Sequence, residues 1–168
     1  MNRKIIYRDI LPGEAGQAAD IEQVCFPPNE ACSPQDMRAR AAAAPELFLV
    51  AVDAESGRLA GFLNGLATKE EAFRDEFFTD ASLYDPEGKN IMLLGLDVLP
   101  PYRKQGVASE LMRRYAARES ARGRRKLILT CLERLVPMYQ HMGYEDLGLS
   151  ASSWGGERWH EMQYLLKS

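Results

Sequence analysis

The sequence predicts a mixed α/β (α+β) fold in which a central sheet of about seven strands carries helices on both faces. Strand-length apolar runs and segments of helical periodicity follow one another in the order β-α-α-β-β-(α)-β-α-β-α-β-β. The chain has no internal repeat and no low-complexity linker, and 168 residues are enough for one sizeable core. We therefore expect residues 1–168 to form a single domain.

Cap and turn signals bound the expected elements of the first half. A double proline after the first helical segment prevents that helix from continuing. Ser33 followed by Pro34 is typical of a helix start, and the next helix must end before Pro45. The expected elements are a strand at 4–8, helices at 14–24 and 33–44, and a hairpin of strands at 48–52 and 59–66.

The segment 69–88 is polar and acidic, with three phenylalanines interspersed. We expect a helix followed by a mobile loop. The segment either forms plain surface or gates an acceptor site, and plain surface is the favoured interpretation.

The second half alternates more regularly. Gly123 is a typical stop for the long helix that precedes it, and the β-branched run after it has the length of a buried strand. The expected elements are strands at 91–98 and 126–132, a helix at 105–122, a short helix around Tyr139, and a closing hairpin of strands at 147–153 and 159–166.

Composition excludes several function classes. A net charge of −3 argues against a nucleic-acid binder with a basic surface. No apolar stretch approaches the ~20 residues that a membrane span needs, and no signal peptide is evident. Three cysteines without zinc-type spacing indicate reduced thiols. We expect a cytoplasmic protein that binds no metal, no membrane and no nucleic acid.

The stretch from Leu93 to Ala108 points to a phosphate site. An apolar strand ends at a double proline, a short basic loop follows, and helical periodicity begins at Val107. This order places free backbone N–H groups at the positive end of a helix, where phosphates bind well. Gly106 allows a ligand to approach the backbone closely.

Arg103-x-x-Gly106-x-Ala108 resembles the acyl-coenzyme A signature of the GNAT acetyltransferases. A second segment, Pro137-x-Tyr139-x-x-x-Gly143-Tyr144, resembles the short helix that follows in that family. Further matching positions, at Cys131, Leu135, Val136, Gln140, Glu161 and Met162, are similar to the arylalkylamine (serotonin) N-acetyltransferase branch. The likeness is good from about Leu93 onward and loose over the first ninety residues.

This resemblance implies a GNAT fold and acetyl-CoA as cosubstrate. The strand before the loop would pair with the pantetheine arm, and the loop with the helix start would hold the pyrophosphate. The implied cofactor-binding residues are Leu96, Asp97, Val98, Arg103, Lys104, Gln105, Gly106, Val107, Ala108 and Ser109.

The resemblance also implies that Tyr139 is the general acid that protonates the departing thiolate. The attacking amine must first lose a proton. For an amine with a pKa of ~10.4, deprotonation at pH 7 costs about 4–5 kcal/mol. A base, a water chain or a desolvated pocket must meet that cost. The two histidines that serve in the arylalkylamine enzymes are replaced here by Met92 and Leu94, which accept no proton.

No single base emerges from the sequence. Asp97 and His160 are candidates, Glu30 is another, and a water chain that ends in a carboxylate is an equal alternative. His141 is expected to be solvated.

Candidate acceptor-binding residues come from two places. By resemblance, Phe26 and Pro27 correspond loosely to a substrate wall, and Trp154 and Trp159 fall where the closing hairpin supplies apolar wall residues. The alternative is that both tryptophans are core or dimer-contact residues. If they line the site, an apolar or aromatic amine is favoured over a polyamine.

We therefore expect an N-acetyltransferase in which a small primary amine attacks acetyl-CoA directly in a ternary complex. The alternatives are a protein or peptide N-acetyltransferase and a non-catalytic module that binds acyl-CoA. A homodimer is possible by analogy with the family.

Overall fold

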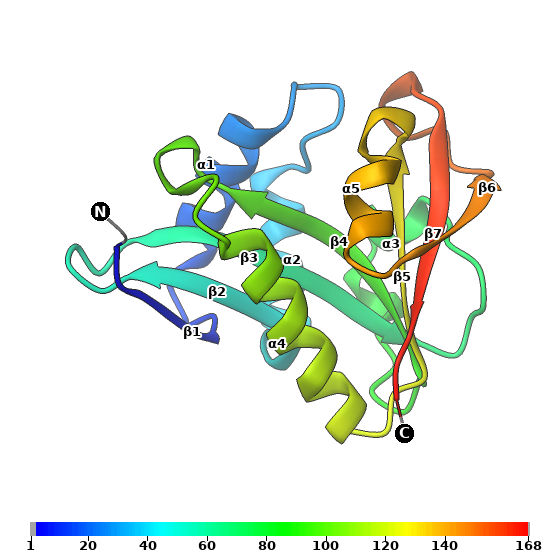
Figure 1. Cartoon of the computed structure of the whole chain (residues 1–168), viewed down its shortest axis with the longest axis horizontal. Coiled ribbons are helices and arrows are strands. Elements are labelled where there is room, and N and C mark those ends of the chain that lie inside the picture. Colours follow the sequence, from blue (N-terminus) through cyan, green and yellow to red (C-terminus); the bar gives the residue numbers. More distant parts are fainter. Residues whose placement is uncertain (1–2, 168) are drawn as a thin grey trace.

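The computed structural model describes residues 3–167, and its seven strands form one mixed sheet in the order β1-β2-β3-β4-β5-β7-β6 (Figure 1). Only β4 and β5 are parallel neighbours, and all other adjacent pairs are antiparallel. The predicted fold class is confirmed. The strands are β1 (Ile5–Asp9), β2 (Phe48–Asp53), β3 (Leu59–Thr68), β4 (Asn90–Val98), β5 (Lys126–Leu132), β6 (Glu145–Leu149) and β7 (Trp159–Leu165).

Helices cover both faces of this sheet, with α4 in front and α1 and α2 behind in the view of Figure 1. The helices are α1 (Ala15–Cys25), α2 (Pro34–Ala43), α3 (Glu76–Thr79), α4 (Val107–Ala121) and α5 (Val136–His141). The predicted cap is present, since the Ser33 side chain accepts a hydrogen bond of 3.0 Å from the Asp36 amide. No helix within residues 3–167 has the length and apolar character needed to cross a membrane.

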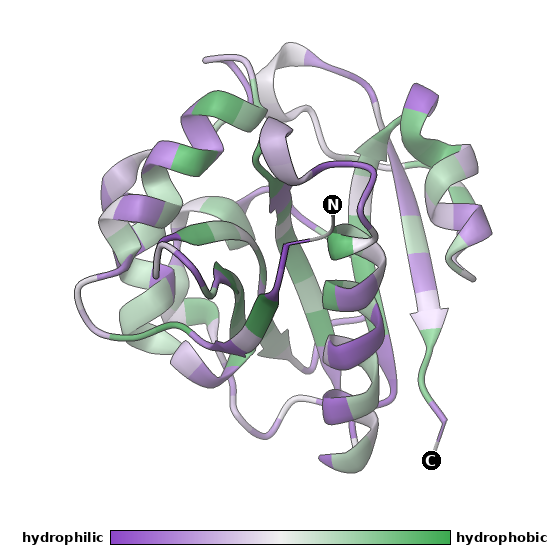
Figure 2. Ribbon diagram, turned by 60° about the vertical axis from the view of Figure 1, so that its left-hand side comes forward, coloured by the Kyte–Doolittle hydropathy of each residue, from purple (hydrophilic) through white to green (hydrophobic). Residues whose placement is uncertain are grey.

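Because the sheet is covered on both faces, its central strands are apolar without alternation. All six residues of β2 are buried. Phe48 and Val50 pack in the cluster beneath α1 and α2, while Leu49 and Ala51 pack in the larger cluster beneath α4. Figure 2 shows this pattern as hydrophobic strands between helices whose outer faces are hydrophilic. Continuous burial explains why these strands lack period-two polarity.

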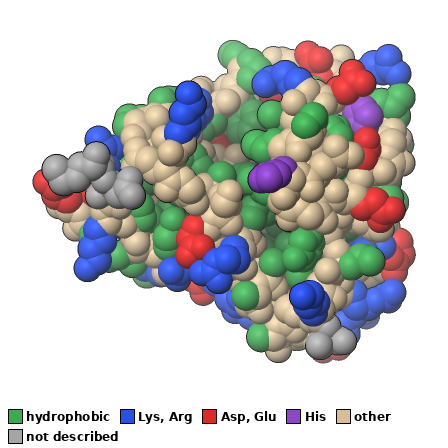
Figure 3. Space-filling view, viewed as in Figure 1, with side chains coloured by type: hydrophobic (Ala, Val, Ile, Leu, Met, Phe, Trp, Pro, Cys, Tyr) green, Lys and Arg blue, Asp and Glu red, His purple; other side chains and the backbone are tan. Residues whose placement is uncertain are grey.

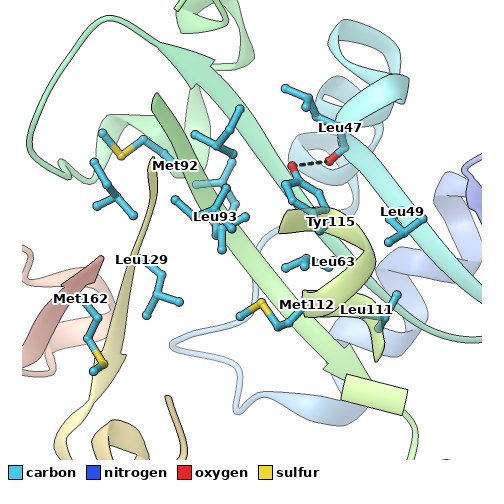
Figure 4. Close-up of a cluster of buried hydrophobic side chains, with 14 of the residues drawn as sticks. Leu47, Leu49, Leu63, Met92, Leu93, Leu111, Met112, Tyr115, Leu129 and Met162 are labelled. Carbon is cyan, nitrogen blue, oxygen red and sulfur yellow. Dashed lines mark hydrogen bonds between the residues drawn. The ribbon is translucent and has the colours of Figure 1, made fainter. Parts of the chain in front are cut away.

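The larger cluster fixes α4 on the sheet (Figure 4). Leu111 and Met112 of α4 lie in the same core as Leu63 of β3. The Tyr115 hydroxyl, fully buried, donates a hydrogen bond of 3.0 Å to the carbonyl of Leu47. A buried hydroxyl needs such a partner, and this one ties the middle of α4 to the start of β2.

A split in the sheet creates the site. β4 and β5 pair only from Asn90–Lys126 to Met92–Ile128, although both strands continue beyond. On the other side of β4, pairing with β3 shifts between Asn64 and Gly65, which leaves Leu94 as an extra residue. A bulge of this kind bends its strand. The carboxyl ends of β4 and β5 therefore diverge.

Three predicted elements are wrong in their extent. Residues 69–88 contain only the four-residue helix α3 and short turns, and Phe73 and Phe77 are buried. The long helix begins at Val107 and not at residue 105, because Gly106 has a left-handed φ of 81° that a helix cannot include. β6 ends at Leu149 and not at residue 153, because the chain leaves the sheet there and leads into the short helical turn at 154–156.

Candidate active site

A cavity of about 410 Å³ occupies the gap between the splayed ends of β4 and β5. Its floor is apolar, with Leu94 and Leu96 from β4 and Leu129 and Cys131 from β5. Figure 3 shows the hollow that separates the two sides of the molecule on this face, with hydrophobic side chains on its walls. The structure brings the four acceptor-binding candidates to this one cavity: Phe26, Pro27, Trp154 and Trp159.

Three aromatic side chains form one connected wall of the cavity. The rings of Phe78 and Trp154 lie with their centroids 4.7 Å apart. Trp154 Nε1 donates to the carbonyl of Glu30, and Trp159 Nε1 donates to the carbonyl of Trp154, each at 2.8 Å. Trp159 is only 8% exposed, so the two tryptophans are not an open pair on the surface.

The segment 69–88 is therefore more than plain surface. Phe78 lines the cavity, and the Asp75 carboxylate binds the closing turn through the Ser152 hydroxyl and through the Ser153 amide at 3.1 Å. The sequence analysis missed Phe78 because nothing local distinguishes it from its two buried phenylalanine neighbours.

A second cavity, of about 540 Å³, lies at the start of α4. Gly106 caps the helix without a side chain, and the first helical hydrogen bond runs from the Glu110 amide to the Gly106 carbonyl. The first-turn amides of 107–109 therefore have no helical acceptor. A side chain on Gly106 would meet open space, so its left-handed φ is what requires glycine. Lys104 also has a positive φ, of 62°.

Most of the predicted cofactor-binding residues lie around these two cavities. Those that line the second cavity are Val98, Arg103, Lys104, Gly106, Val107, Ala108 and Ser109. Leu96 lines the first cavity instead. Two predicted residues line neither cavity: the Gln105 side chain turns back to the Pro101 carbonyl at 2.9 Å, and the Asp97 side chain is buried.

Arg103 anchors the loop between the cavities. Its Nε donates a hydrogen bond of 2.8 Å to the carbonyl of Val98, and another guanidinium nitrogen lies 3.6 Å from Cys25 Sγ. The two cavities adjoin, because four residues line both of them: Val98, Arg103, Ala108 and Met138.

Tyr139 lies on the wall of the first cavity, on the short helix α5. It is 9% exposed, and its ring packs edge-on against Tyr144 with centroids 5.8 Å apart. Burial raises the pKa of Tyr139, so the phenol keeps its proton throughout the neutral range. The structure therefore presents a neutral proton donor on the wall of the first cavity.

The base candidates are placed unequally. His160 Nδ1 lies 3.1 Å from Asp146 Oδ1 and does not line the cavity, so the structure does not bring this candidate to the site. His141 is exposed at the second cavity. Glu30 does line the first cavity, and burial raises the pKa of its carboxyl group. Leu94 lines it as well, whereas Met92 is fully buried where β4 and β5 still pair.

The sequence analysis missed Glu22, a polar residue of α1 that lines the cavity and is only 4% exposed. Its Oε2 accepts a hydrogen bond of 3.0 Å from the Cys32 amide. The available signal was helical periodicity, since Glu22 follows the buried Ala18 at a spacing of four on the inner face of α1. Within residues 3–167, no three His, Cys, Asp or Glu side chains are grouped as metal ligands would be.

Residues 16–144 match the Acetyltransferase (GNAT) family, and the chain belongs to this family. The chain is 29% identical over 165 residues to serotonin N-acetyltransferase of Mesocricetus auratus, covering 96% of this chain and 77% of that protein. Family membership and this relative support acyltransferase activity.

Solved structures share the fold. A GNAT-like decarboxylase, GphF, in complex with isobutyryl-CoA has a TM-score of 0.79 at 18% identity, covering 96% of this chain and 100% of that chain. A phosphinothricin acetyltransferase from Sinorhizobium meliloti in complex with AcCoA has a TM-score of 0.67 at 18% identity, covering 96% and 88%.

Proposed function

We propose that this chain is an acetyl-CoA-dependent N-acetyltransferase that acetylates the primary amine of a small apolar or aromatic acceptor. One observation carries the proposal: the cleft at the start of α4 opens into an apolar cavity that holds the neutral phenol of Tyr139. A cosubstrate with a diphosphate at one end and a thioester at the other fits that arrangement.

The residues at the start of α4 suit the diphosphate of acetyl-CoA. The uncapped amides of 107–109 lie at the positive end of a 15-residue helix, and Lys104 adds a positive charge beside them. The unpaired edge of β4 beyond Met92 leaves backbone groups for the pantetheine arm. CoA or acetyl-CoA is also part of three of the structural relatives, which supports this choice.

In this proposal the amine attacks the thioester directly, without an acyl-enzyme. Tyr139 donates its proton to the departing thiolate, for which a neutral phenol is needed. The backbone near Leu96 polarises the thioester carbonyl as negative charge develops on its oxygen.

The acceptor class follows from the cavity. A volume of about 410 Å³ is in the range of small-molecule sites, and aromatic rings from Phe78, Trp154 and Trp159 form much of one wall. A largely apolar cavity of this size favours a small amine over a peptide, which would need an extended groove. The similarity to a serotonin N-acetyltransferase supports an aromatic acceptor.

The test is release of free CoA thiol from acetyl-CoA with a panel of arylalkylamines, polyamines, amino acids and peptides. We expect turnover with arylalkylamines above the other classes. Turnover confined to peptides would overturn the acceptor class. Tight binding of acetyl-CoA with no thiol release from any amine would replace the enzyme with a non-catalytic acyl-CoA-binding module.

A further inference from the structure

Two acidic side chains, Glu22 of α1 and Asp97 of β4, are buried against each other behind the first cavity. Glu22 is 4% exposed and Asp97 is 1% exposed. A Cβ placed on Gly95 would lie 3.2 Å from Asp97 Oδ1 and 3.7 Å from Glu22 Oε1, so both oxygens face the same point. The two carboxyl groups are close enough that Glu22, after burial itself, raises the pKa of Asp97.

The proximity of two buried acids favours a proton held between them. Within residues 3–167 neither oxygen of Asp97 meets an N–H or O–H donor, and Glu22 Oε1 meets none either. Two ionised carboxylates both accept, so they repel each other and cannot share a hydrogen bond. Two carboxyl groups at close range in a poorly solvated site instead retain one proton between them.

The groups around the pair do not replace that proton. The thiols of Cys25 on α1 and Cys32 on the following loop are the other titratable neighbours of Asp97. Neither nearby arginine hydrogen-bonds to the pair: Arg103 binds the Val98 carbonyl, and one nitrogen of the buried Arg40 of α2 binds the Phe78 carbonyl at 2.8 Å while its other two nitrogens meet no acceptor within residues 3–167. A pair that holds one proton carries a single negative charge, and within the described residues no arginine hydrogen-bonds to either carboxyl group.

We propose that Glu22 is the proton acceptor for the attacking amine and that Asp97, protonated and hydrogen-bonded to it, is its positioning residue. This inference rests on the proposed function. Glu22 is the member that lines the cavity, whereas Asp97 does not line it. The arrangement supplies the acid–base function that Met92 and Leu94 cannot provide.

The proton balance closes with the groups present. The acceptor enters as an ammonium ion, and Glu22 takes one N–H proton, which leaves the pair with two protons and no charge. The amine lone pair forms the C–N bond to the thioester carbon, and the C–S bond breaks with its electrons on sulfur. Tyr139 protonates the sulfur and regains a proton from the acetylated nitrogen through water. The pair then releases its extra proton to solvent.

The surroundings agree with this division of roles. Burial, and then the neighbouring Glu22, raise the pKa of Asp97 well above its usual range. Glu22 and Tyr139 line the same cavity, and burial raises the pKa of Tyr139. The base and the acid thus approach the acceptor site from α1 and α5 respectively.

The central experiment compares Glu22→Gln with the wild type on two amines. Glutamine keeps the acceptor for the Cys32 amide but takes no proton. With 2-phenylethylamine, whose amine is charged at pH 7, we expect kcat/KM to fall by about 10²–10⁴-fold. With its 2,2-difluoro analogue, a far weaker base, the loss should shrink to a few-fold. Acetyl-CoA affinity should be unchanged, and Asp20→Asn, on the exposed face of α1, should match the wild type.

Asp97 is tested through the pH profile. Asp97→Asn keeps a donor for Glu22, so the acidic limb of kcat/KM should stay near its wild-type position. Asp97→Leu removes the donor, and the limb should move to higher pH because the negative form of Glu22 loses its hydrogen bond. Equal loss on both amines in Glu22→Gln, or unmoved limbs in both Asp97 variants, would show that the pair is only structural and overturn the inference.

An NMR measurement that needs no enzymatic turnover distinguishes a failure of this inference from a failure of the proposed function. In ¹³C-carboxyl spectra assigned with the Glu22 and Asp97 variants, we expect Asp97 to remain protonated at neutral pH. If no amine reacts but Asp97 is protonated, the N-acetyltransferase proposal fails while the shared proton stands. If both carboxyl groups ionise at ordinary acidic pH, the inference fails whatever the turnover.

Discussion

The ring of Phe78 packs on that of Trp154 at a centroid separation of 4.7 Å, and this contact joins the acidic 69–88 segment to the closing turn before β7. Trp154 is held from the other side, since its indole N–H donates to the Glu30 carbonyl. Three segments that are distant in the sequence thus meet at one wall of the first cavity.

Replacing Trp154 with alanine should weaken acceptor binding without affecting the cosubstrate. Loss of an aromatic contact of this kind is worth about 0.5–1.5 kcal/mol. We expect the KM for 2-phenylethylamine to rise about two- to tenfold while the KM for acetyl-CoA stays constant. Tyr7→Ala is the control, because Tyr7 packs under Arg114 at β1 and lines neither cavity. Equal changes in both KM values would show a general disturbance of the fold.

Tyr139→Phe should lower kcat by about 10²–10⁴-fold, because phenylalanine keeps the packing but has no proton for the thiolate. The dissociation constant for acetyl-CoA, measured by calorimetry, should be nearly unchanged. Since burial raises the pKa of Tyr139, the wild-type enzyme should also show no loss of turnover from this group up to about pH 10. Unchanged turnover in the variant would remove Tyr139 from the mechanism.

Gly106→Ala should reduce both stability and acetyl-CoA affinity. The left-handed φ of 81° costs an alanine about 1–2 kcal/mol, measurable by urea unfolding. Gly57→Ala is a matched control, since Gly57 has a φ of 75°, also has open space at its Cβ, and lies in the β2–β3 hairpin. Both variants should lose similar stability, and only Gly106→Ala should bind acetyl-CoA more weakly. Equal affinity in the two variants would contradict the proposed diphosphate site.

Cys131→Ala should retain acetyl transfer. Although Cys131 lines the first cavity, burial raises its pKa to about 12, so almost none of it is thiolate at neutral pH. Its Sγ lies 3.5 Å from the Met162 sulfur, as expected for a packed thiol. Mass spectrometry of the wild type mixed with acetyl-CoA should show no acetylated Cys131. An acetyl group on that cysteine during turnover would contradict direct attack.

Asp97→Asn should change how stability depends on pH. The native pKa of Asp97 is raised, so the folded chain keeps a proton on this carboxyl group. In the unfolded chain the same group loses its proton above the ordinary Asp pKa of ~3.9. The unfolding free energy from this group therefore falls by about 1.36 kcal/mol per pH unit until the raised native pKa is passed. The variant lacks this slope, so its unfolding free energy should increase relative to that of the wild type as the pH rises. Urea unfolding at several pH values measures the difference, and parallel curves would contradict a raised native pKa.

The elements with local signals were predictable from the sequence. Ser33-Pro34 marks the start of α2, Gly123 follows the end of α4, and the Gly106 loop lies where the strand–loop–helix order predicted a loop. These signals depend on residues within one or two turns of chain, where backbone sterics and capping decide the structure.

The weaker predictions concerned segments whose shape depends on distant partners. The segment 69–88 has helix-compatible polarity, yet Phe73 and Phe77 are drawn into the core and only α3 remains helical. His160 was a base candidate by residue type alone, and its contact with Asp146 of β6 depends on a strand pairing that no local pattern encodes.

The sequence by itself determined the order of strands and helices and the Gly106 loop before α4, because those features follow from local periodicity and turn chemistry, and its resemblance to the GNAT family placed Tyr139 on a short helix. Tertiary structure alone decided that β4 and β5 diverge after Met92, that Phe78 meets Trp154, and that Glu22 faces Asp97. These contacts arise from sheet pairing and helix packing between residues far apart in the chain, so the chemistry of the cavity is a property of the folded molecule.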